Sequence, residues 1–183
     1  MAQKGTSTRA RGITCDLPVT LRFHPACWHP TGKRHPALVA QVEGGAGFAV
    51  HRTYLRADGS GKAAVDPPRA MLGAVAGGAV RLAEAEGPLV VAEGIETTLS
   101  LASGLLCAPA SIWATLSTSG MAGLRLPRVP GRLTIATDGD APGQKAGLEL
   151  ATRATALGWR VSILPAPMGR DWNDVLMMKG AAA

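Results

Sequence analysis

The sequence predicts an α/β fold in which helices flank a parallel sheet, preceded by a small, basic and mainly β subdomain. Two observations lead to this prediction. From residue 88 onward, short apolar runs alternate with helical patterns, as they do in a wound parallel sheet. Hydrophobic residues make up 46% of the chain but aromatic residues only 4%, so aliphatic side chains must form the core. This composition favours helices packed on a buried sheet over an aromatic-rich β-sandwich.

The first half of the chain is expected to contain an arm followed by the β subdomain. Residues 1–14 are polar and basic, which predicts a flexible arm. Residues 15–87 contain short apolar runs divided by Gly, Pro and charged residues, so we expect the small basic subdomain there. Its clearest strands are the runs at 36–43 and 47–55, which flank a glycine-rich turn.

The second half, residues 88–183, is predicted to form the domain with the parallel sheet. The apolar run at 89–93 stops on an acid, as a buried parallel strand does. The segment 141–158 is an amphipathic helix, with Pro142 in its first turn and Gly158 at its end. Further strands are expected at 111–116, from residue 132 and at 159–167, and further helices at 97–103 and 172–180.

The net charge of the chain indicates which kinds of binding partner to expect. The formal net charge is +6 and the isoelectric point about 9.8, so a polyanion such as nucleic acid is a natural partner. A basic protein without such a partner is the alternative that charge alone leaves open. Neither a secretory signal nor an apolar run of membrane-spanning length is visible, so we expect a cytoplasmic protein with no membrane partner.

A group of cysteines and histidines near the N-terminus raises the question of a zinc site. The group consists of Cys15, His24, Cys27, His29 and His35. Their spacing matches no standard zinc finger, and buried cysteines with loop histidines are the other interpretation. The sequence does not decide between the two.

Acidic residues follow three of the predicted strands. Glu93 ends the first strand, Asp138 and Asp140 follow the third, and Asp171 comes after the fourth. In a wound α/β sheet, functional groups gather beyond the carboxyl ends of the strands. Mg²⁺ prefers hard oxygen ligands, usually one or two carboxylates with waters and substrate phosphates. For Asp138 and Asp140 the alternative is a role as helix caps, but an acid at the end of another strand favours metal chemistry.

Three ordered blocks around these acids resemble the signature blocks of the Toprim domain: LVVAEGIETTLSLASG, TIATDGDAPGQKAG and GRDWNDVL. The resemblance implies a general acid or base at Glu93 and Mg²⁺ or Mn²⁺ bound by Asp138 and Asp140. It also implies a further acid near the metal, Asp171. Supporting groups beside it would be Asn173 and Asp174.

Within the Toprim proteins, the blocks are most similar to primases of phages, plasmids and integrated mobile elements. The segment before them resembles the basic segment that precedes the Toprim domain in primases, which places Arg52 and Lys62 as groups that hold template or nucleotide. We also assign Arg69 and Lys145 to this role, although a solvated surface charge is the alternative for both.

One position departs from the primase pattern. Primases commonly carry an aspartate four residues after the first-block glutamate, where this chain has Thr97. The neighbouring Glu96 is a candidate substitute.

The resemblance therefore implies a DNA primase-type nucleotidyltransferase that makes RNA primers on single-stranded DNA from NTPs. A Toprim-type nuclease would need the same acids and is the first alternative. A non-catalytic nucleic-acid-binding subunit of a replication complex is the second. A helicase or a zinc-bearing primase subunit is the protein partner that the primase interpretation implies.

Overall fold

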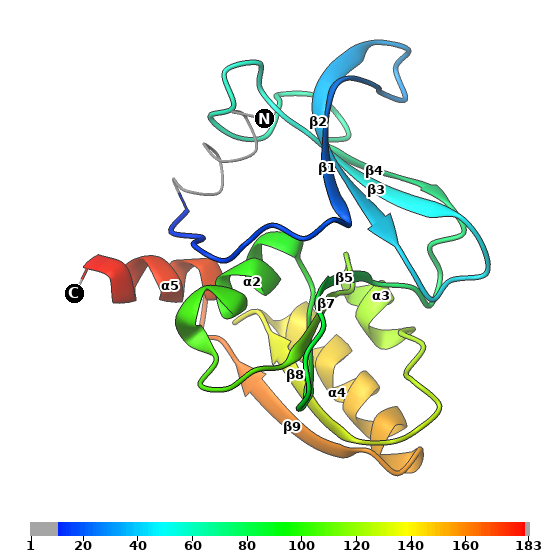
Figure 1. The fold of residues 1–183 in the computed structure, drawn as a ribbon, viewed down its shortest axis with the longest axis vertical. Coiled ribbons are helices and arrows are strands. Elements are labelled where there is room, and N and C mark those ends of the chain that lie inside the picture. Colours follow the sequence, from blue (N-terminus) through cyan, green and yellow to red (C-terminus); the bar gives the residue numbers. More distant parts are fainter. Residues whose placement is uncertain (1–10, 182–183) are drawn as a thin grey trace.

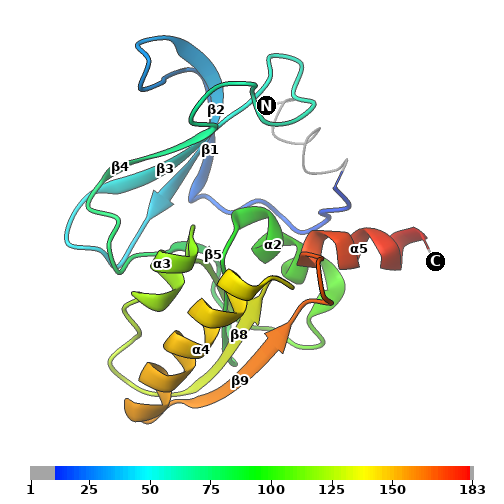
Figure 2. The same cartoon turned by 180° about the vertical axis from the view of Figure 1, so that it is seen from behind.

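The computed structural model describes residues 11–181. They form two sheets, and the first lies above the second in Figures 1 and 2. The first sheet is antiparallel, with its strands in sequence order. Its strands are β1 (Leu21–Trp28), β2 (Arg34–Val42), β3 (Ala49–Tyr54) and β4 (Arg69–Gly73). The predicted basic β subdomain thus contains a complete four-stranded sheet.

The second sheet has five strands in the order β5-β7-β6-β8-β9. All of its neighbours are parallel except the edge strand β5, which pairs antiparallel with β7. Its strands are β5 (Val80–Ala83), β6 (Leu89–Ala92), β7 (Ser111–Ala114), β8 (Arg132–Thr137) and β9 (Arg160–Pro165). The predicted α/β fold class is confirmed, with a sheet that is mainly rather than wholly parallel.

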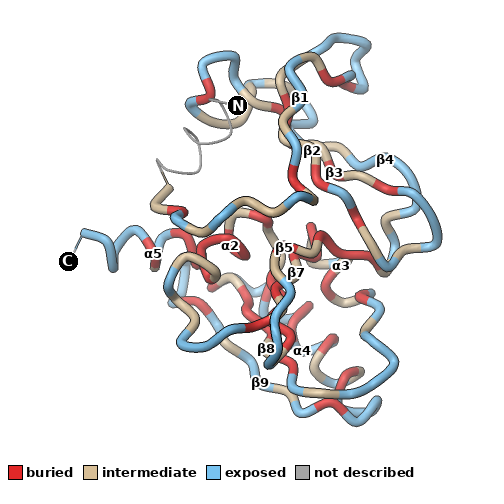
Figure 3. Tube along the Cα trace, viewed as in Figure 1, coloured by how far each residue is buried: buried red, intermediate tan, exposed pale blue. Residues whose placement is uncertain are grey.

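Helices cover both faces of this second sheet. They are α2 (Ile95–Ser100), which continues into the π-helical turn η1 (Leu101–Leu105), α3 (Thr118–Ala122), α4 (Ala141–Ala156) and α5 (Trp172–Ala181). The buried side of α4 packs with α3 on one face, whereas η1 and α5 pack on the other. Strand β6 is buried along its whole length, so the core lies on both of its sides. Figure 3 shows further buried residues along β8 and α4. Within residues 11–181, no helix combines the length and hydropathy needed to span a bilayer.

Several elements were not predicted from the sequence, namely β1, β4, β5 and α3. Strand β1 contains Pro25 and changes register between His24 and Cys27, so its apolar alternation is broken. Helix α3 is only five residues long and is capped by Ser117, whose Oγ accepts a hydrogen bond from the Gly120 amide. Short elements of this kind depend on their neighbours more than on local sequence.

Residues 11–14 are a correction to the flexible arm predicted for residues 1–14. Ile13 is only 4% exposed and belongs to a core cluster with α2 and α5 residues. The Asn173 amide of α5 donates to the Arg11 carbonyl at 2.8 Å and to Ser100 Oγ at 3.0 Å. The apolar Ile13 and these bonds hold the segment on the domain, while residues 1–10 lie outside the described part. The division of the chain at residue 87 stays a prediction, although β5 already joins the second sheet.

The turn after β8 and the loop after β9 are joined through their backbones. The Gly139 amide donates to the Arg170 carbonyl at 2.8 Å, and the Gly169 amide donates to the Gly139 carbonyl at 2.9 Å. A Cβ atom on Gly139 would overlap the carbonyl oxygen of Pro167. Only glycine therefore permits this close approach, which places residues 138–140 beside residue 171.

Replacing Gly139 by alanine should destabilise the fold by about 1–3 kcal/mol, because the added methyl group must displace backbone rather than a flexible side chain. Chemical denaturation measures this change. Gly47→Ala is the matched control, since no atom lies within 4 Å of its Cβ position. The control should alter stability by less than about 0.5 kcal/mol. Equal effects of the two substitutions would contradict the close approach.

Candidate active site

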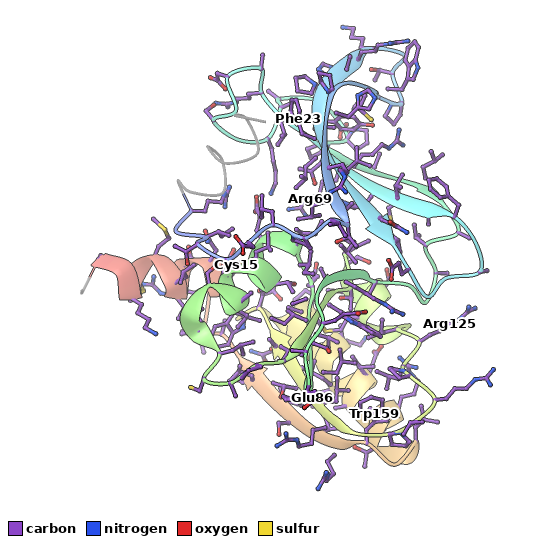
Figure 4. The ribbon with its side chains drawn as sticks, viewed as in Figure 1. Cys15, Phe23, Arg69, Glu86, Arg125 and Trp159 are labelled. Atoms are coloured by element: carbon purple, nitrogen blue, oxygen red, sulfur yellow. The ribbon has the colours of Figure 1, made fainter. Side chains whose placement is uncertain are left out.

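A cavity of about 250 Å³ lies between the first sheet and the carboxyl edge of the second. Its walls come from β1–β4, from the segment before β1, from α2, and from the residues that follow β6, β8 and β9. Charged residues of both signs line it: Arg11, Lys62, Arg69, Glu93, Glu96, Asp138 and Asp171. Figure 4 labels two lining residues of the first sheet, Phe23 and Arg69.

Glu93 and Asp138 meet because β6 and β8 are parallel neighbours with Ala92 opposite Ala136. Both carboxyl groups are half-buried. Burial raises the pKa of Glu93, and the charges of Asp138 and Asp140 raise it further. Burial also raises the pKa of Asp138 to about 6, with Asp171 and Asp140 as the next causes. The predicted convergence of acids from separate strand ends is therefore present in the structure.

Asp140 and Asp171 take part in helix caps at the same edge. Asp140 is the N-cap of α4, and its Oδ1 accepts a hydrogen bond from the Gly143 amide at 2.8 Å. Asp171 Oδ1 accepts from the Asp174 amide at 2.9 Å, and Asp174 Oδ2 accepts from the Asp171 amide at 3.2 Å. The capping alternative thus applies to Asp140 but not to Asp138. A cap uses one carboxylate oxygen, so the second oxygen of Asp140 can serve another ligand.

The opposite side of the cavity is cationic. Arg69 lies close enough to Glu93 to lower the pKa of that carboxyl, although burial and the neighbouring acids outweigh it. Glu96 forms ion pairs with Arg11 at 3.4 Å and with Lys62 at 3.7 Å. Two predicted phosphate-binding residues, Lys62 and Arg69, thus reach the acidic edge. Glu96 pairs with cations rather than joining the carboxylates.

Arg52 does not line the cavity, and its role in holding template or nucleotide stays a prediction. Side chains alternate along a strand, and the cavity side of β3 carries His51 and Thr53. Arg52 therefore faces the other side of the sheet, where its guanidinium donates to the Trp28 carbonyl at 2.9 Å. The guanidinium also donates to the Met71 carbonyl of β4 at 3.5 Å, so its contacts join β3 to both β1 and β4.

Lys145 and Asn173 also lie outside the cavity. Lys145 is exposed on α4 and stands 4.0 Å from Glu149 in an ion pair along the helix. Asn173 is only 7% exposed, and its amide joins α5 to Ser100 and Arg11. These positions favour a surface charge for Lys145 and a structural contact for Asn173.

His51 and Thr97 line the cavity, although the sequence analysis gave neither residue a role in the site. His51 is 5% exposed, and burial lowers its pKa to about 4, with Arg69, Arg52 and Lys62 as further causes. Thr97 Oγ1 donates to Asp138 Oδ1 at 3.5 Å, so the departure from the primase pattern faces the acidic edge. The alternation along the predicted strand 47–55 could have identified His51, but no apolar pattern indicated which face was inward.

The acidic edge fits a hard divalent cation. Burial and mutual repulsion make the ionised forms of Glu93 and Asp138 costly, and a cation would relieve that cost. No group of three His, Cys, Asp or Glu side chains in residues 11–181 is arranged to hold a metal ion by itself. Mg²⁺ commonly uses only one or two carboxylates, with waters and substrate phosphates completing its shell. Asp138 and Asp140, with Glu93 beside them, suit that mode of binding.

Three members of the N-terminal group of cysteines and histidines, Cys15, Cys27 and His29, have packing or hydrogen-bonding roles in the structure. Cys27 lies in a small core with Ala37 and Tyr54, whereas Cys15 packs near α2. His29 is buried, and its ring bonds to Thr31 Oγ1 and the Pro67 carbonyl.

Comparison with protein families gave two matches. The model described as the Toprim domain matches residues 88–182, which is more than half of the chain. A second model, described as a domain of unknown function (DUF7146), matches residues 7–82. A search of curated proteins gave no match.

Solved structures share the fold at low sequence identity. A DNA primase domain from Pseudomonas aeruginosa is 20% identical, with a TM-score of 0.50 over 87% of this chain and 52% of that one. The zinc-binding and RNA polymerase domains of the Aquifex aeolicus primase are 16% identical. That TM-score is 0.60, over 100% of this chain and 54% of the other. The chain thus spans about half the length of these two structures.

Asp138→Asn should stabilise the protein at neutral pH in the absence of divalent cations. The raised pKa means that the folded state binds this proton more tightly than the unfolded chain. The stabilisation that this proton gives the folded wild-type protein is fully present below about pH 4. It is lost as the pH rises through about 6, where Asp138 ionises in the folded state. After allowance for solvent screening, the variant should gain about 1 kcal/mol over wild type above pH 6. Denaturation at pH 4–8 tests this, with the exposed Asp66→Asn as control.

Mg²⁺ should raise the melting temperature of the wild-type protein, since a ligand that binds only the folded state stabilises it. At about ten times the dissociation constant the stabilisation is about 1.4 kcal/mol, so the shift should be about 3–6 °C for a chain of this size. Thermal denaturation with and without Mg²⁺ measures it. Asp138→Asn should lose most of the shift, whereas Asp66→Asn should keep it. A full shift in Asp138→Asn would place the cation elsewhere.

Proposed function

This chain belongs to the Toprim domain family, and from this premise we propose that it is a primase-type nucleotidyltransferase. It would make short RNA primers on single-stranded DNA. One observation carries the proposal: carboxyl groups from separate strand ends meet cationic side chains of the other sheet in a single cavity. Phosphoryl transfer requires both, because the reacting phosphates need cations and a hydroxyl nucleophile needs a proton acceptor.

Asp138 and Asp140 would hold the divalent cation, with Asp171 beside them. When bound, Mg²⁺ or Mn²⁺ would neutralise charge that develops on the transferred phosphoryl group. Lys62 and Arg69 would hold the triphosphate from the opposite wall, since both line the cavity. Their contacts add affinity that falls with salt and carry no base preference.

Glu93 would act as the proton acceptor. Its carboxyl is half-buried, and its pKa is raised by burial and by Asp138, which makes it a better base than an exposed glutamate. The attacking hydroxyl oxygen would form a bond to the α-phosphorus while the bond to pyrophosphate breaks. The hydroxyl proton would pass to Glu93 and from there to solvent.

The choice of a primase is supported by both halves of the chain. The solved structures that share the fold include a DNA primase domain and a primase RNA polymerase domain. The blocks around Glu93 and Asp171 also resemble those of phage, plasmid and mobile-element primases, and we propose this branch as the origin. The primase interpretation implies a helicase or a zinc-bearing primase subunit as protein partner, and we propose a partner of this kind.

Primer synthesis is the direct test. Purified protein is incubated with single-stranded DNA, labelled NTPs and Mg²⁺ or Mn²⁺, and short RNA products are expected. Glu93→Gln should reduce their rate by about 10²–10⁴-fold, as is usual for loss of a general base. Glu86→Gln is the matched control, because Glu86 is exposed at the opposite end of β6 and should leave the rate unchanged (Figure 4).

Two other results would contradict the proposal. Cleavage of the DNA without synthesis would assign the same acids to a nuclease. Salt-sensitive binding of DNA with neither reaction would assign the chain to a non-catalytic subunit.

A further inference from the structure

The wall that the first sheet presents to the cavity changes in character from strand to strand. Register places Phe23 opposite Leu38, Leu38 opposite Thr53, and Thr53 opposite Arg69, so these side chains form one row across the sheet. All four line the cavity. Adjacent strands lie about 4.8 Å apart, so the row spans roughly 14 Å from an aromatic ring to a guanidinium. The wall is apolar on β1 and β2, neutral and polar on β3, and cationic on β4.

His51 provides a second polar group on the middle strand. It lies two residues before Thr53 on the same face and lines the same cavity. None of the described residues forms a hydrogen bond with its ring, and Nδ1 is fully buried. A buried N–H without an acceptor is unfavourable, so the ring proton belongs on Nε2. Nε2 is thus left as a neutral donor for a ligand in the cavity.

From β1 to β4, the side chains of this wall change from apolar to neutral polar to cationic. The parts of a nucleotide follow the same order, from base to ribose to phosphates. A base is flat and offers a face to an aromatic or aliphatic side chain such as Phe23. Phosphates are anionic and suit Arg69 and Lys62. The ribose lies between base and phosphates, as β3 lies between β2 and β4. The neutral ring of His51 suits a hydroxyl group better than a phosphate, for which cations are available beside it.

We propose that this wall binds a nucleotide with its base on β1 and β2, its ribose on β3 and its phosphates at β4, and that His51 Nε2 donates a hydrogen bond to the ribose 2′-hydroxyl. The site would therefore select ribonucleotides over deoxyribonucleotides. A site built around a substrate hydroxyl discriminates against the analogue that lacks it, because its buried polar group is then left without a partner. This inference rests on the proposed function and names the residue that sets its substrate class.

Equilibrium binding tests the inference without any synthesis. The full chain is titrated with ATP and with 2′-deoxy-ATP in Mg²⁺ by calorimetry, in the absence of template. Wild-type protein should bind ATP about three- to tenfold more tightly, the range expected for one neutral hydrogen bond. His51→Phe fills the same space without a donor and should bind both nucleotides equally, at the level of 2′-deoxy-ATP.

Two further variants make the test specific. His51→Gln keeps a neutral N–H donor and should retain part of the preference, even if the phenylalanine variant does not fold. His24→Phe is the matched control, because His24 is exposed on β1 and does not line the cavity, and it should behave like wild type.

Equal binding of both nucleotides by the wild-type protein, or no ATP binding at millimolar concentration, would overturn the inference. An ATP preference that survives in His51→Phe would do the same. These failures are separate from failure of the proposed function. A protein that makes primers while His51→Phe keeps the preference contradicts only the inference. A protein that loses the preference in His51→Phe yet makes no primers contradicts only the primase activity.

Discussion

The backbone contact between Gly139 and residues 167–170 is the constraint on which the candidate site depends. It holds the turn after β8 against the loop after β9, so that Asp138 and Asp171 lie at one edge. Burial raises the pKa of Asp138, and the repulsion between these carboxyl groups raises it further. The rest of the fold thus offsets the unfavourable repulsion between these clustered charges, as is common at functional sites.

The cavity needs both sheets, because each supplies what the other lacks. The second sheet contributes the acids, and the first contributes Arg69 with the neutral side chains of β3. Ion pairs from Glu96 to Lys62 and Arg11 connect the two parts, although they are partly exposed and each is worth little alone. The segment before β1 adds a firmer connection, since Ile13 is buried in a core that includes residues of both sheets. A substrate between the walls would therefore contact residues far apart in the sequence.

Much of the second domain could be predicted, because its signals are local. Buried strands appear as continuous apolar runs, and α4 carries both a Pro near its start and a Gly just after its end. The convergence of Glu93 and Asp138 followed from the rule for parallel strand ends. The first sheet was harder, since β3 buries polar His51 and Thr53 and gives no apolar alternation. For this reason the sequence did not show that Arg52 faces away from the cavity. The contact of Gly139 with Arg170 is non-local, so sequence alone could not show how closely Asp171 approaches.

The central claim is that the acidic edge exists to hold a divalent cation in front of the cationic wall. Crystals of the protein soaked in Mn²⁺ test this most directly, because anomalous scattering locates the ion independently of any activity. The account predicts a peak at about 2.0–2.3 Å from a carboxylate oxygen of Asp138, with Asp140 or Glu93 also within reach directly or through water. Strong Mn²⁺ peaks elsewhere, with none beside Asp138, would contradict it.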